Sequence, residues 1–320
     1  MRDTILFGDC RQTLKEFDEQ ARMCVTSPPY YGLRDYGGED NQIGQEQTPD
    51  EFIDQLVNVF KEVRNVLTDD GTCWVNLGDS YYNYRPGKGQ GLPKQSVANT
   101  KQDLPDVCPR RGNRIEGLKE KDLIGIPWLF AFAMRNDGWY LRQDIIWHKP
   151  NPMPESVRDR CTKSHEYIFL FSKNKKYFYD NEAIKEPAKD WGTRDRTNGK
   201  YHNEGTGLQP HSGLTKSYPT KNKRSVWSVT VKPYKEAHFA TYPPDLIEPC
   251  ILAGSEKGDT VLDPFMGAGT TAAVAKALGR NYIGCELNEN YGNLIEKRIQ
   301  DYQPVNKVAQ EPCINILDII

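Results

Sequence analysis

A strand, a glycine loop and the start of a helix are indicated by residues 261–271, which read Val-Leu-Asp-Pro-Phe-Met-Gly-Ala-Gly-Thr-Thr. Gly267 and Gly269 let a ligand approach the backbone closely, because no side chain stands in the way. The spacing is not Gly-x-Gly-x-x-Gly and there is no Walker lysine, which disfavours dinucleotide and triphosphate sites. The next apolar run ends in Glu286, whose carboxylate suits two ribose hydroxyls. With Asp263 suited to an ammonium group, the segment predicts a site for adenosine joined to an amino acid.

A second apolar run, residues 21–26, ends in Ser27-Pro28-Pro29-Tyr30. Two prolines remove two N–H donors, which leaves the Ser27 hydroxyl and the carbonyls of Ser27 and Pro28 as acceptors. Two acceptors that grip an exocyclic amine favour attack by its nitrogen and stabilise the charge that develops in the transition state. Tyr30 can stack on a base flipped out of a duplex. Taken alone, these four residues also fit a polyproline turn.

Apolar periodicity predicts an α/β fold. Short apolar runs alternate with stretches of helical spacing, which argues for a largely parallel sheet covered on both faces. Thr48 before Pro49 suits the start of a helix. The predicted strands are 4–7, 21–26, 71–77, 141–147, 167–172, 260–262 and 281–286, and the predicted helices are 49–67, 122–136, 242–253, 270–278 and 291–299.

Positive charge is concentrated in one part of the chain. The 320 residues carry a net charge of −2, yet segment 173–235 holds 14 Lys and Arg against 6 Asp and Glu, while the rest holds 28 against 38. A basic insert on an acidic body predicts a DNA-binding region, with a solvated variable loop as the alternative. The candidate contacts to DNA or the base are Trp147, Lys149, Arg194, Arg196, Lys221, Lys223 and Arg224.

Other function classes find no support in the sequence. The eight cysteines form no Cys-x-x-Cys pair, and we predict no metal site. No apolar run is long enough to span a membrane and no signal peptide is evident, so we expect a soluble, cytoplasmic protein. Residues 83–121 are predicted to be a long polar loop, and residues 304–320 a tail.

The two motifs together resemble a known family. Ser-Pro-Pro-Tyr at 27–30 and Asp-Pro-Phe-x-Gly-x-Gly-Thr-Thr at 263–271 resemble those of amino-group DNA methyltransferases of restriction–modification systems and phages. The catalytic loop precedes the cofactor loop, as in the permuted β group of that family. The resemblance implies a Rossmann-like, S-adenosylmethionine-dependent methyltransferase fold with a seven-stranded, largely parallel sheet and a small irregular recognition insert. The strands that end at Thr26 and Asp263 would then be neighbours.

The resemblance also assigns segments and residues. Residues 1–172 and 236–303 would form the catalytic domain and 173–235 the target-recognition region, with segments 146–150 and 164–166 beside the target base. The catalytic residues would be Ser27, Pro28, Pro29 and Tyr30. The S-adenosyl-L-methionine site would take Asp9, His238, Phe239, Asp263, Pro264, Phe265, Gly267, Gly269, Thr270, Thr271 and Glu286.

The base and the partners follow from the same resemblance. Serine at the first position of the catalytic loop usually accompanies N4-cytosine methylation and aspartate N6-adenine methylation, so Ser27 favours cytosine, with adenine as the alternative. Double-stranded DNA is the implied partner. A cognate restriction endonuclease that acts separately is compatible with it, and the oligomeric state stays open. A nicotinamide-dependent oxidoreductase is a distant alternative, because it explains neither Ser-Pro-Pro-Tyr nor the basic insert.

Overall fold

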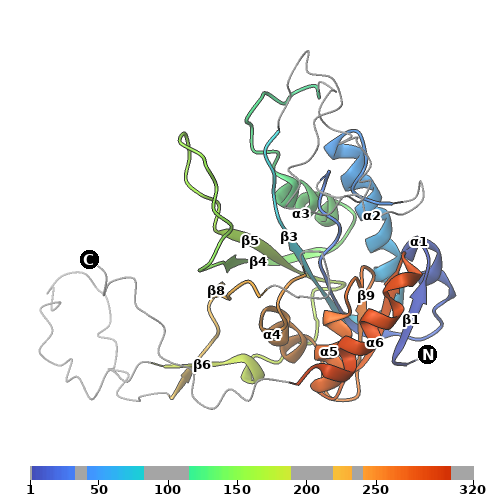
Figure 1. Ribbon diagram of the computed structural model, residues 1–320. Coiled ribbons are helices and arrows are strands. Elements are labelled where there is room, and N and C mark those ends of the chain that lie inside the picture. Colours follow the sequence, from blue (N-terminus) through green and yellow to red (C-terminus); the bar gives the residue numbers. More distant parts are fainter. Residues whose placement is uncertain (1, 33–41, 83–114, 189–218, 233–240, 304–320) are drawn as a thin grey trace, which may run out of the picture.

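The computed structural model describes residues 2–32, 42–82, 115–188, 219–232 and 241–303, and a twisted sheet runs through it (Figure 1). Its strands are β1 (Thr4–Phe7), β2 (Ala21–Thr26), β3 (Leu67–Leu77), β4 (Tyr140–His148), β5 (His165–Ser172), β8 (Val226–Ser228), β9 (Thr260–Asp263) and β10 (Asn281–Glu286). They lie in the order β1-β10-β9-β2-β3-β5-β4-β8. A separate antiparallel pair is formed by β6 (Glu186–Pro187) and β7 (Thr220–Lys221).

The sheet is mostly parallel, as predicted. From β1 to β3 all neighbours are parallel, whereas β5 is antiparallel to both β3 and β4. Within the described residues the sheet has eight strands, one more than the seven that the resemblance implied. The additional strand, β8, pairs in parallel with β4 and comes from the segment assigned to target recognition. Three residues are too short to show an alternating pattern, so pairing alone makes this segment a strand.

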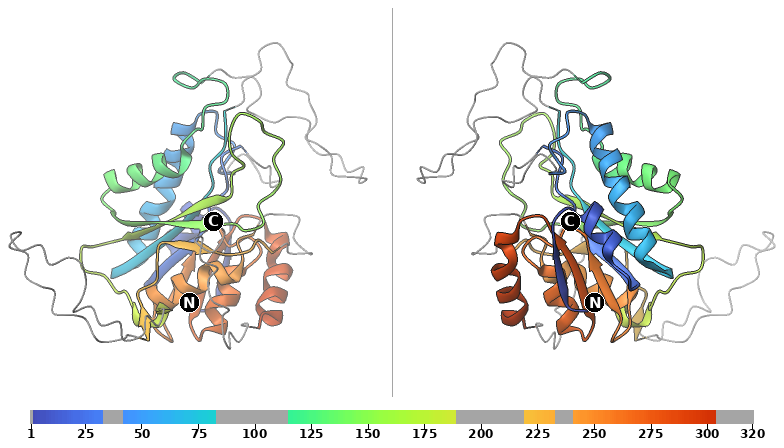
Figure 2. Two further views of the ribbon diagram at one scale, coloured as in Figure 1. Left: turned by 90° about the vertical axis from the view of Figure 1, so that its left-hand side faces the viewer. Right: turned by 90° about the vertical axis from the view of Figure 1, so that its right-hand side faces the viewer.

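Helices cover both faces of the sheet, as Figure 2 shows from two sides. One layer contains α1 (Cys10–Thr13), α2 (Pro49–Val66) and α3 (Ile126–Asn136), and the other contains α4 (Pro244–Gly254), α5 (Thr270–Ala277) and α6 (Gly292–Asp301). Short 3₁₀ helices span Leu14–Glu16, Glu182–Ile184 and Glu289–Tyr291. Along β2 the buried side chains alternate between the layers: Cys24 packs with the first, and Met23 and Val25 with the second.

The start of α2 shows how a local sequence determines an element. The Thr48 hydroxyl accepts a hydrogen bond from the Glu51 backbone N–H, and the Glu51 carboxylate accepts one from the Thr48 N–H, both at 3.2 Å. This capping box, with Pro49 at the first position, satisfies donors that a helix start leaves free. Phe52, Leu56 and other apolar residues at helical spacing then face the core.

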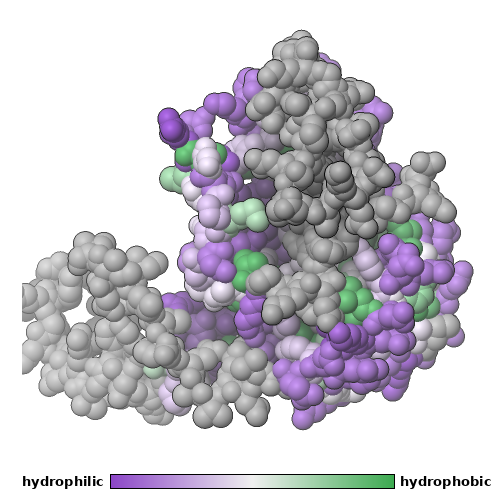
Figure 3. Space-filling view, in the orientation of Figure 1, coloured by the Kyte–Doolittle hydropathy of each residue, from purple (hydrophilic) through white to green (hydrophobic). Residues whose placement is uncertain are grey.

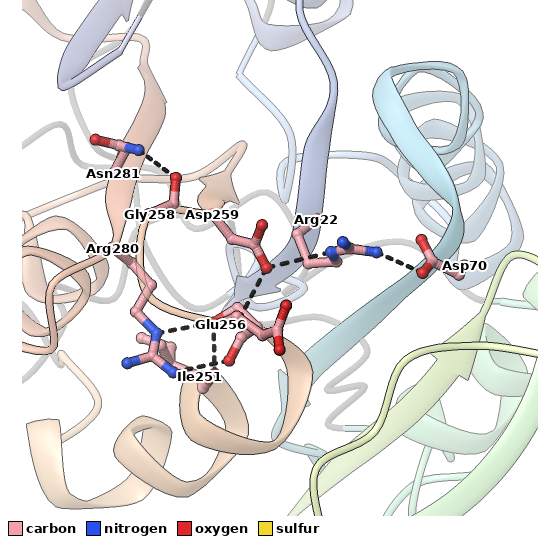
Figure 4. A network of polar contacts seen from close by, with 9 residues as sticks. Arg22, Asp70, Ile251, Glu256, Gly258, Asp259, Arg280 and Asn281 are labelled. Carbon is pink, nitrogen blue, oxygen red and sulfur yellow. Dashed lines mark hydrogen bonds and ion pairs between the residues drawn. The ribbon is translucent and has the colours of Figure 1, made fainter.

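Ion pairs tie the strands together at the edge where they begin (Figure 4). Arg22, on β2, bonds Asp70 of β3 and, at 3.2 Å, Asp259 just before β9. Arg280 donates to the Ser255 carbonyl at 2.7 Å in the same region. Strands β2, β3 and β9 are thus aligned at one edge, and their opposite ends carry the residues of the candidate site.

The described surface seen in Figure 3 is largely hydrophilic around α5 and α6. This agrees with α6, which buries Ile295 and exposes mainly polar residues. Among the described residues, no helix is long and apolar enough to cross a membrane. Within the same ranges, no cluster of three or more His, Cys, Asp or Glu side chains could hold a metal ion.

Candidate active site

The two predicted loops lie side by side at the carboxyl edge of the sheet. Strands β2 and β9 are adjacent and parallel, with Met23 opposite Val261 and Cys24 opposite Leu262, which confirms the expected neighbours. The Thr26 hydroxyl donates to Asp263 Oδ1 at 2.6 Å. Since Ser27 follows Thr26 directly, this bond joins the Ser-Pro-Pro-Tyr loop to the start of the glycine loop.

Asp263 has a different environment from the one expected. Its side chain is 1% exposed. Besides Thr26, its carboxylate accepts hydrogen bonds from the hydroxyls of Thr271 at 2.5 Å and Tyr242 at 3.1 Å, and from the Phe265 N–H at 3.0 Å. Burial raises the pKa of Asp263, while the three hydroxyl donors and the Phe265 N–H lower it. The carboxylate is therefore enclosed and joins β2, α5 and the glycine loop, and its expected contact with a ligand's ammonium group stays a prediction.

The glycine loop is held by Glu286 at the end of β10. Glu286 Oε2 accepts a hydrogen bond from the Gly267 N–H at 2.8 Å, and Oε1 accepts one from the Asn288 N–H at 2.9 Å. Burial raises the pKa of Glu286 to about 7, against the effect of these backbone donors. Gly267 and Gly269 have φ values of +53° and +81°, in the left-handed region that favours glycine. Each carboxylate oxygen keeps a lone pair for a further donor.

Asp9 lies at the same edge, beyond β1. Phe7 is paired in register with Glu286, and the Gly8 N–H donates to the Glu286 carbonyl at 2.9 Å. The Asp9 carboxylate caps α1 and forms an ion pair with Arg11 at 2.6 Å. Burial opposes the effect, but the hydrogen bonds from Arg11 hold the pKa of Asp9 below its ordinary value. The structure therefore brings Asp9 near Glu286, and the Asp9 carboxylate is already paired with the Arg11 guanidinium.

The Ser-Pro-Pro-Tyr loop contacts Asn76, which the sequence did not single out, and Glu166, which belongs to the segment 164–166 expected beside the target base. Tyr30 Oη donates to Glu166 of β5 at 2.8 Å, and Asn76 Nδ2 of β3 lies 3.3 Å from Ser27 Oγ. Burial, followed by the nearby Glu166 charge, raises the pKa of Tyr30 well above its ordinary value. A polar residue inside the apolar run 71–77 was a usable signal for Asn76.

Tyr242, which follows closely after the predicted cofactor residues His238 and Phe239, also joins the network around Asp263. Its hydroxyl bonds both Asp263 and the Thr271 hydroxyl, although it lies 21 residues before Asp263. The predicted cofactor residues Pro264, Phe265, Thr270 and Thr271 do lie on this loop and the first turn of α5. His238 and Phe239 are outside the described residues.

The predicted DNA contacts are distributed differently. Trp147 is 3% exposed, and its indole N–H donates to the Val229 carbonyl at 2.8 Å, so the side chain packs in the core and its predicted contact with a base stays a prediction. Lys149 lies over the Trp147 ring at 4.2 Å and pairs with Glu166. An alternating strand pattern cannot distinguish a buried indole from an exposed one when both faces of the strand are covered.

In the segment assigned to recognition, two of the candidate cations are paired with a carboxylate. Lys223 and Arg224 form ion pairs with Glu186 at 3.8 and 3.1 Å, and Lys223 also lies over the Trp227 ring at 5.0 Å. Lys221 belongs to β7 and is half-buried. Arg194 and Arg196 are outside the described residues. These ion pairs join described residues from two separate parts of the segment, so two of its cations are already neutralised.

Sequence comparison gives a consistent group of relatives. The profile of a DNA methylase family matches residues 21–297. The chain is 46% identical to the Type II methyltransferase M.SmaI of Serratia marcescens, covering 92% of this chain and 90% of that protein. It is 45% identical to the Type II methyltransferase M.Cfr9I of Citrobacter freundii, covering 93% and 87%.

Solved structures share the fold. The PvuII DNA methyltransferase, described as cytosine-N4-specific, aligns with a TM-score of 0.61 and 18% identity over 97% of this chain and 89% of its own. A putative DNA modification methylase of Thermus thermophilus, solved in complex with S-adenosyl-L-methionine, aligns with a TM-score of 0.56 and 23% identity over 94% of each chain. The arrangement of strands and helices is thus one that DNA methyltransferases have.

Proposed function

Because this chain belongs to the DNA methylase family whose profile spans residues 21–297, and to its restriction–modification type, we propose that it methylates the N4 amino group of cytosine within a specific DNA sequence. One observation carries the proposal. The Thr26–Asp263 hydrogen bond, at 2.6 Å, holds the Ser27 loop against the glycine loop. A base at the first loop and a methyl donor at the second would therefore meet at one edge of the sheet.

The residues of the glycine loop suit S-adenosyl-L-methionine. Among the described residues, a Cβ on Gly267 would meet the Phe265 carbonyl oxygen at 3.9 Å and no other atom within 4 Å, which leaves room for a ligand at the loop. Glu286 keeps acceptor capacity for the ribose hydroxyls, and Pro264, Phe265, Gly269 and Thr270 complete the loop. When bound, the cofactor supplies an electrophilic methyl group on sulfur.

Ser27 and Pro28 act on the amino group of the base. The exocyclic nitrogen is a poor nucleophile, because its lone pair is delocalised into the ring. The Ser27 hydroxyl and the carbonyl of Ser27 or Pro28 accept hydrogen bonds from the two N–H groups of the amine and draw its nitrogen toward tetrahedral geometry. These acceptors stabilise the positive charge on nitrogen more strongly in the transition state than in the ground state. Tyr30 stacks on the flipped base.

The choice of cytosine rests on Ser27. In the family that the chain resembles, serine at this position usually accompanies N4-cytosine methylation. Asn76 donates to the Ser27 hydroxyl oxygen at 3.3 Å, and a hydroxyl that accepts one bond keeps a second lone pair for an amine N–H. N6-adenine methylation is the second candidate, since the same acceptors serve an adenine amino group.

Mass spectrometry of nucleosides tests this proposal directly. Bacterial DNA is incubated with the protein and S-adenosylmethionine that carries a deuterated methyl group, then digested to nucleosides. We expect labelled N4-methylcytosine. Labelled N6-methyladenine instead would show that the target base is adenine. Ser27→Ala should be slower by about 100-fold, as for the loss of one stabilising transition-state contact. A Ser27→Ala protein as active as the wild type would contradict the assigned role.

The remaining assignments are part of the same proposal. Residues 1–172 and 236–303 form the catalytic domain, and residues 173–235 read the target sequence, with Lys221 among the phosphate contacts. The substrate places the protein in the cytoplasm with the DNA. A cognate endonuclease that cuts the unmethylated sequence acts separately. Protection of DNA from such an enzyme after methylation would identify the sequence.

A further inference from the structure

One carboxylate beside the Ser-Pro-Pro-Tyr loop has three partners at once. Glu166 lies near the start of β5, opposite Trp147 of β4. Tyr30 Oη donates to Glu166 Oε2 at 2.8 Å, and Asn76 Nδ2 donates to the same oxygen at 3.2 Å. Lys149 Nζ donates to Oε1. Both oxygens of Glu166 are therefore engaged, and its side chain is only 13% exposed.

We propose that Glu166 is a positioning residue for methyl transfer, which sets the orientation of Tyr30 and, through Asn76, that of the Ser27 hydroxyl. The inference rests on the proposed function and deepens it, because it names the group that keeps the catalytic loop in its working geometry. Glu166 itself does not touch the reacting atoms in this assignment.

Tyr30 is held at both ends and on one face. A Cβ on Gly78 would lie 2.9 Å from Tyr30 Cε2, so the ring rests directly on the backbone there. Pro28 and Pro29 restrict the chain that leads to Tyr30, and Glu166 binds its hydroxyl. With these constraints the ring keeps one plane, which is what stacking on a flipped base requires.

Asn76 transmits the effect of Glu166 to Ser27. Its Nδ2 lies 3.2 Å from Tyr30 Oη and 3.3 Å from Ser27 Oγ, and the residue is 3% exposed. The hydroxyls of Ser27 and Tyr30 can each donate or accept, whereas an ionised carboxylate only accepts. Glu166 therefore forces the amide to turn its NH₂ group toward Ser27. The cost is visible at Asn76 Oδ1, which is buried without a hydrogen-bond partner among the described residues.

Lys149 fixes the carboxylate from the other side. Its ammonium group lies 4.2 Å from the centre of the Trp147 ring, and its side chain is 19% exposed. The Trp147 indole in turn bonds the Val229 carbonyl next to β8. A largely buried ion pair contributes little net stability after desolvation. We therefore assign its role to the geometry that it imposes on the loop.

The test compares Glu166→Gln and Glu166→Ala with a matched control, Glu62→Gln. Glu62 is a partly exposed glutamate of α2 that pairs with Lys15 at 4.0 Å. In Glu166→Gln an NH₂ group replaces one carboxylate oxygen and no longer requires a donor from Asn76. The Asn76 amide is then free to turn, and the Ser27 hydroxyl loses its hydrogen bond from Asn76. We expect kcat to fall about 10- to 100-fold, with the KM for S-adenosylmethionine within about twofold. The control should keep the wild-type kcat.

A double-mutant cycle with Tyr30→Phe identifies the route of the effect. Because part of the effect of Glu166 passes through Tyr30, adding Glu166→Gln to Tyr30→Phe should lower kcat less than it does in the wild type, and the remaining loss is the part that passes through Asn76. Equal losses in both backgrounds would overturn the proposal, as would a Glu166→Ala protein with wild-type kcat. Thermal unfolding of each variant identifies any loss of activity that comes from unfolding.

A second readout does not need activity. In protein with ¹³C-labelled tyrosine, the Cζ resonance of Tyr30 is assigned by its loss in Tyr30→Phe. This resonance should shift in Glu166→Gln and stay in place in Glu62→Gln. An unchanged resonance overturns the assigned contact even if the protein is active. If the wild type methylates no base, the proposed function fails, and the resonance then decides only whether Glu166 holds the Tyr30 hydroxyl.

Discussion

Replacing Thr26 by valine removes one hydroxyl and keeps the shape of the side chain. The substitution probes the contact between the two loops, because the Thr26 hydroxyl donates to Asp263 Oδ1 at 2.6 Å. Both residues are 1% exposed, so water cannot replace the lost donor. The carboxylate keeps its bonds to Thr271, Tyr242 and the Phe265 N–H.

The magnitude follows from these contacts. A hydrogen bond to a charged group contributes about 1.5–3 kcal/mol, and three remaining donors limit the damage. We expect the free energy of unfolding at neutral pH to fall by about 2 kcal/mol. For a chain of 320 residues that corresponds to a decrease in Tm of about 3 °C.

The pH dependence gives a sharper signature. Burial raises the pKa of Asp263, so the folded protein binds its proton more tightly than the unfolded chain does, and stability falls as the pH rises between the two pKa values. Thr26 lowers the folded-state pKa by its hydrogen bond, and its loss raises that pKa further. The deficit of the variant should therefore be largest at high pH and should shrink as the pH falls through the pKa of Asp263.

Urea unfolding of both proteins across a pH series measures this deficit. Thr260→Val is the matched control, because Thr260 is a buried threonine of β9 whose hydroxyl is not among the partners of Asp263. A Thr26→Val protein as stable as the wild type would refute the reasoning. A deficit that grows as the pH is lowered would refute the assignment of the effect to the ionised carboxylate.

Further substitutions test Glu286, the glycine loop and the basic segment. Burial raises the pKa of Glu286 to about 7, so the affinity for S-adenosylmethionine, measured by calorimetry, should rise between about pH 6 and about pH 8. Glu286→Gln should flatten this rise and should bind the cofactor about tenfold more weakly at the upper end. Equal pH profiles for the two proteins would contradict the ribose contact. Gly269→Ala forces alanine to a φ of +81° and places its Cβ 2.8 Å from Ile295. The free energy of unfolding, measured by heat or urea, should therefore fall by about 2 kcal/mol or more. Wild-type stability of this variant would show that the loop can shift. Lys221→Ala should reduce the slope of log affinity for DNA against log salt by about 0.9, as measured by fluorescence anisotropy. Lys223→Ala should change the slope by less than half as much, because the Lys223 ammonium group is already ion-paired. An unchanged slope for Lys221→Ala would show that Lys221 does not contact a phosphate.

The fold class and the order of the motifs were readable along the chain. Strands such as β2 and β9 are continuous apolar runs that end at polar loops, and the helix at Pro49 begins with a local capping signal. These features depend on residues within a few positions of one another. The eighth strand was not readable, because β8 is three residues long and exists through its pairing with β4.

The site was readable only in part. The two loops were predicted from their own residues, yet Glu166 lies 136 positions from Tyr30, with which it bonds, and Asn76 lies 49 positions from Ser27. Trp147 was a candidate contact to the DNA or the base, and pairing with β8 together with the hydrogen bond to the Val229 carbonyl packs it in the core. Likewise the charge count of the basic segment was correct, while the pairing of Lys223 and Arg224 with Glu186 was not visible in it.

By itself the sequence determined which loops carry chemistry, because glycines and prolines restrict the backbone locally whatever surrounds them. Only the tertiary structure decided what each charged group faces. Asp263 was suited by its position to an ammonium group, and the fold instead surrounds it with the hydroxyls of Thr26, Tyr242 and Thr271. A buried carboxylate must find donors within hydrogen-bond distance, and those donors come from strands and helices that are distant in the sequence.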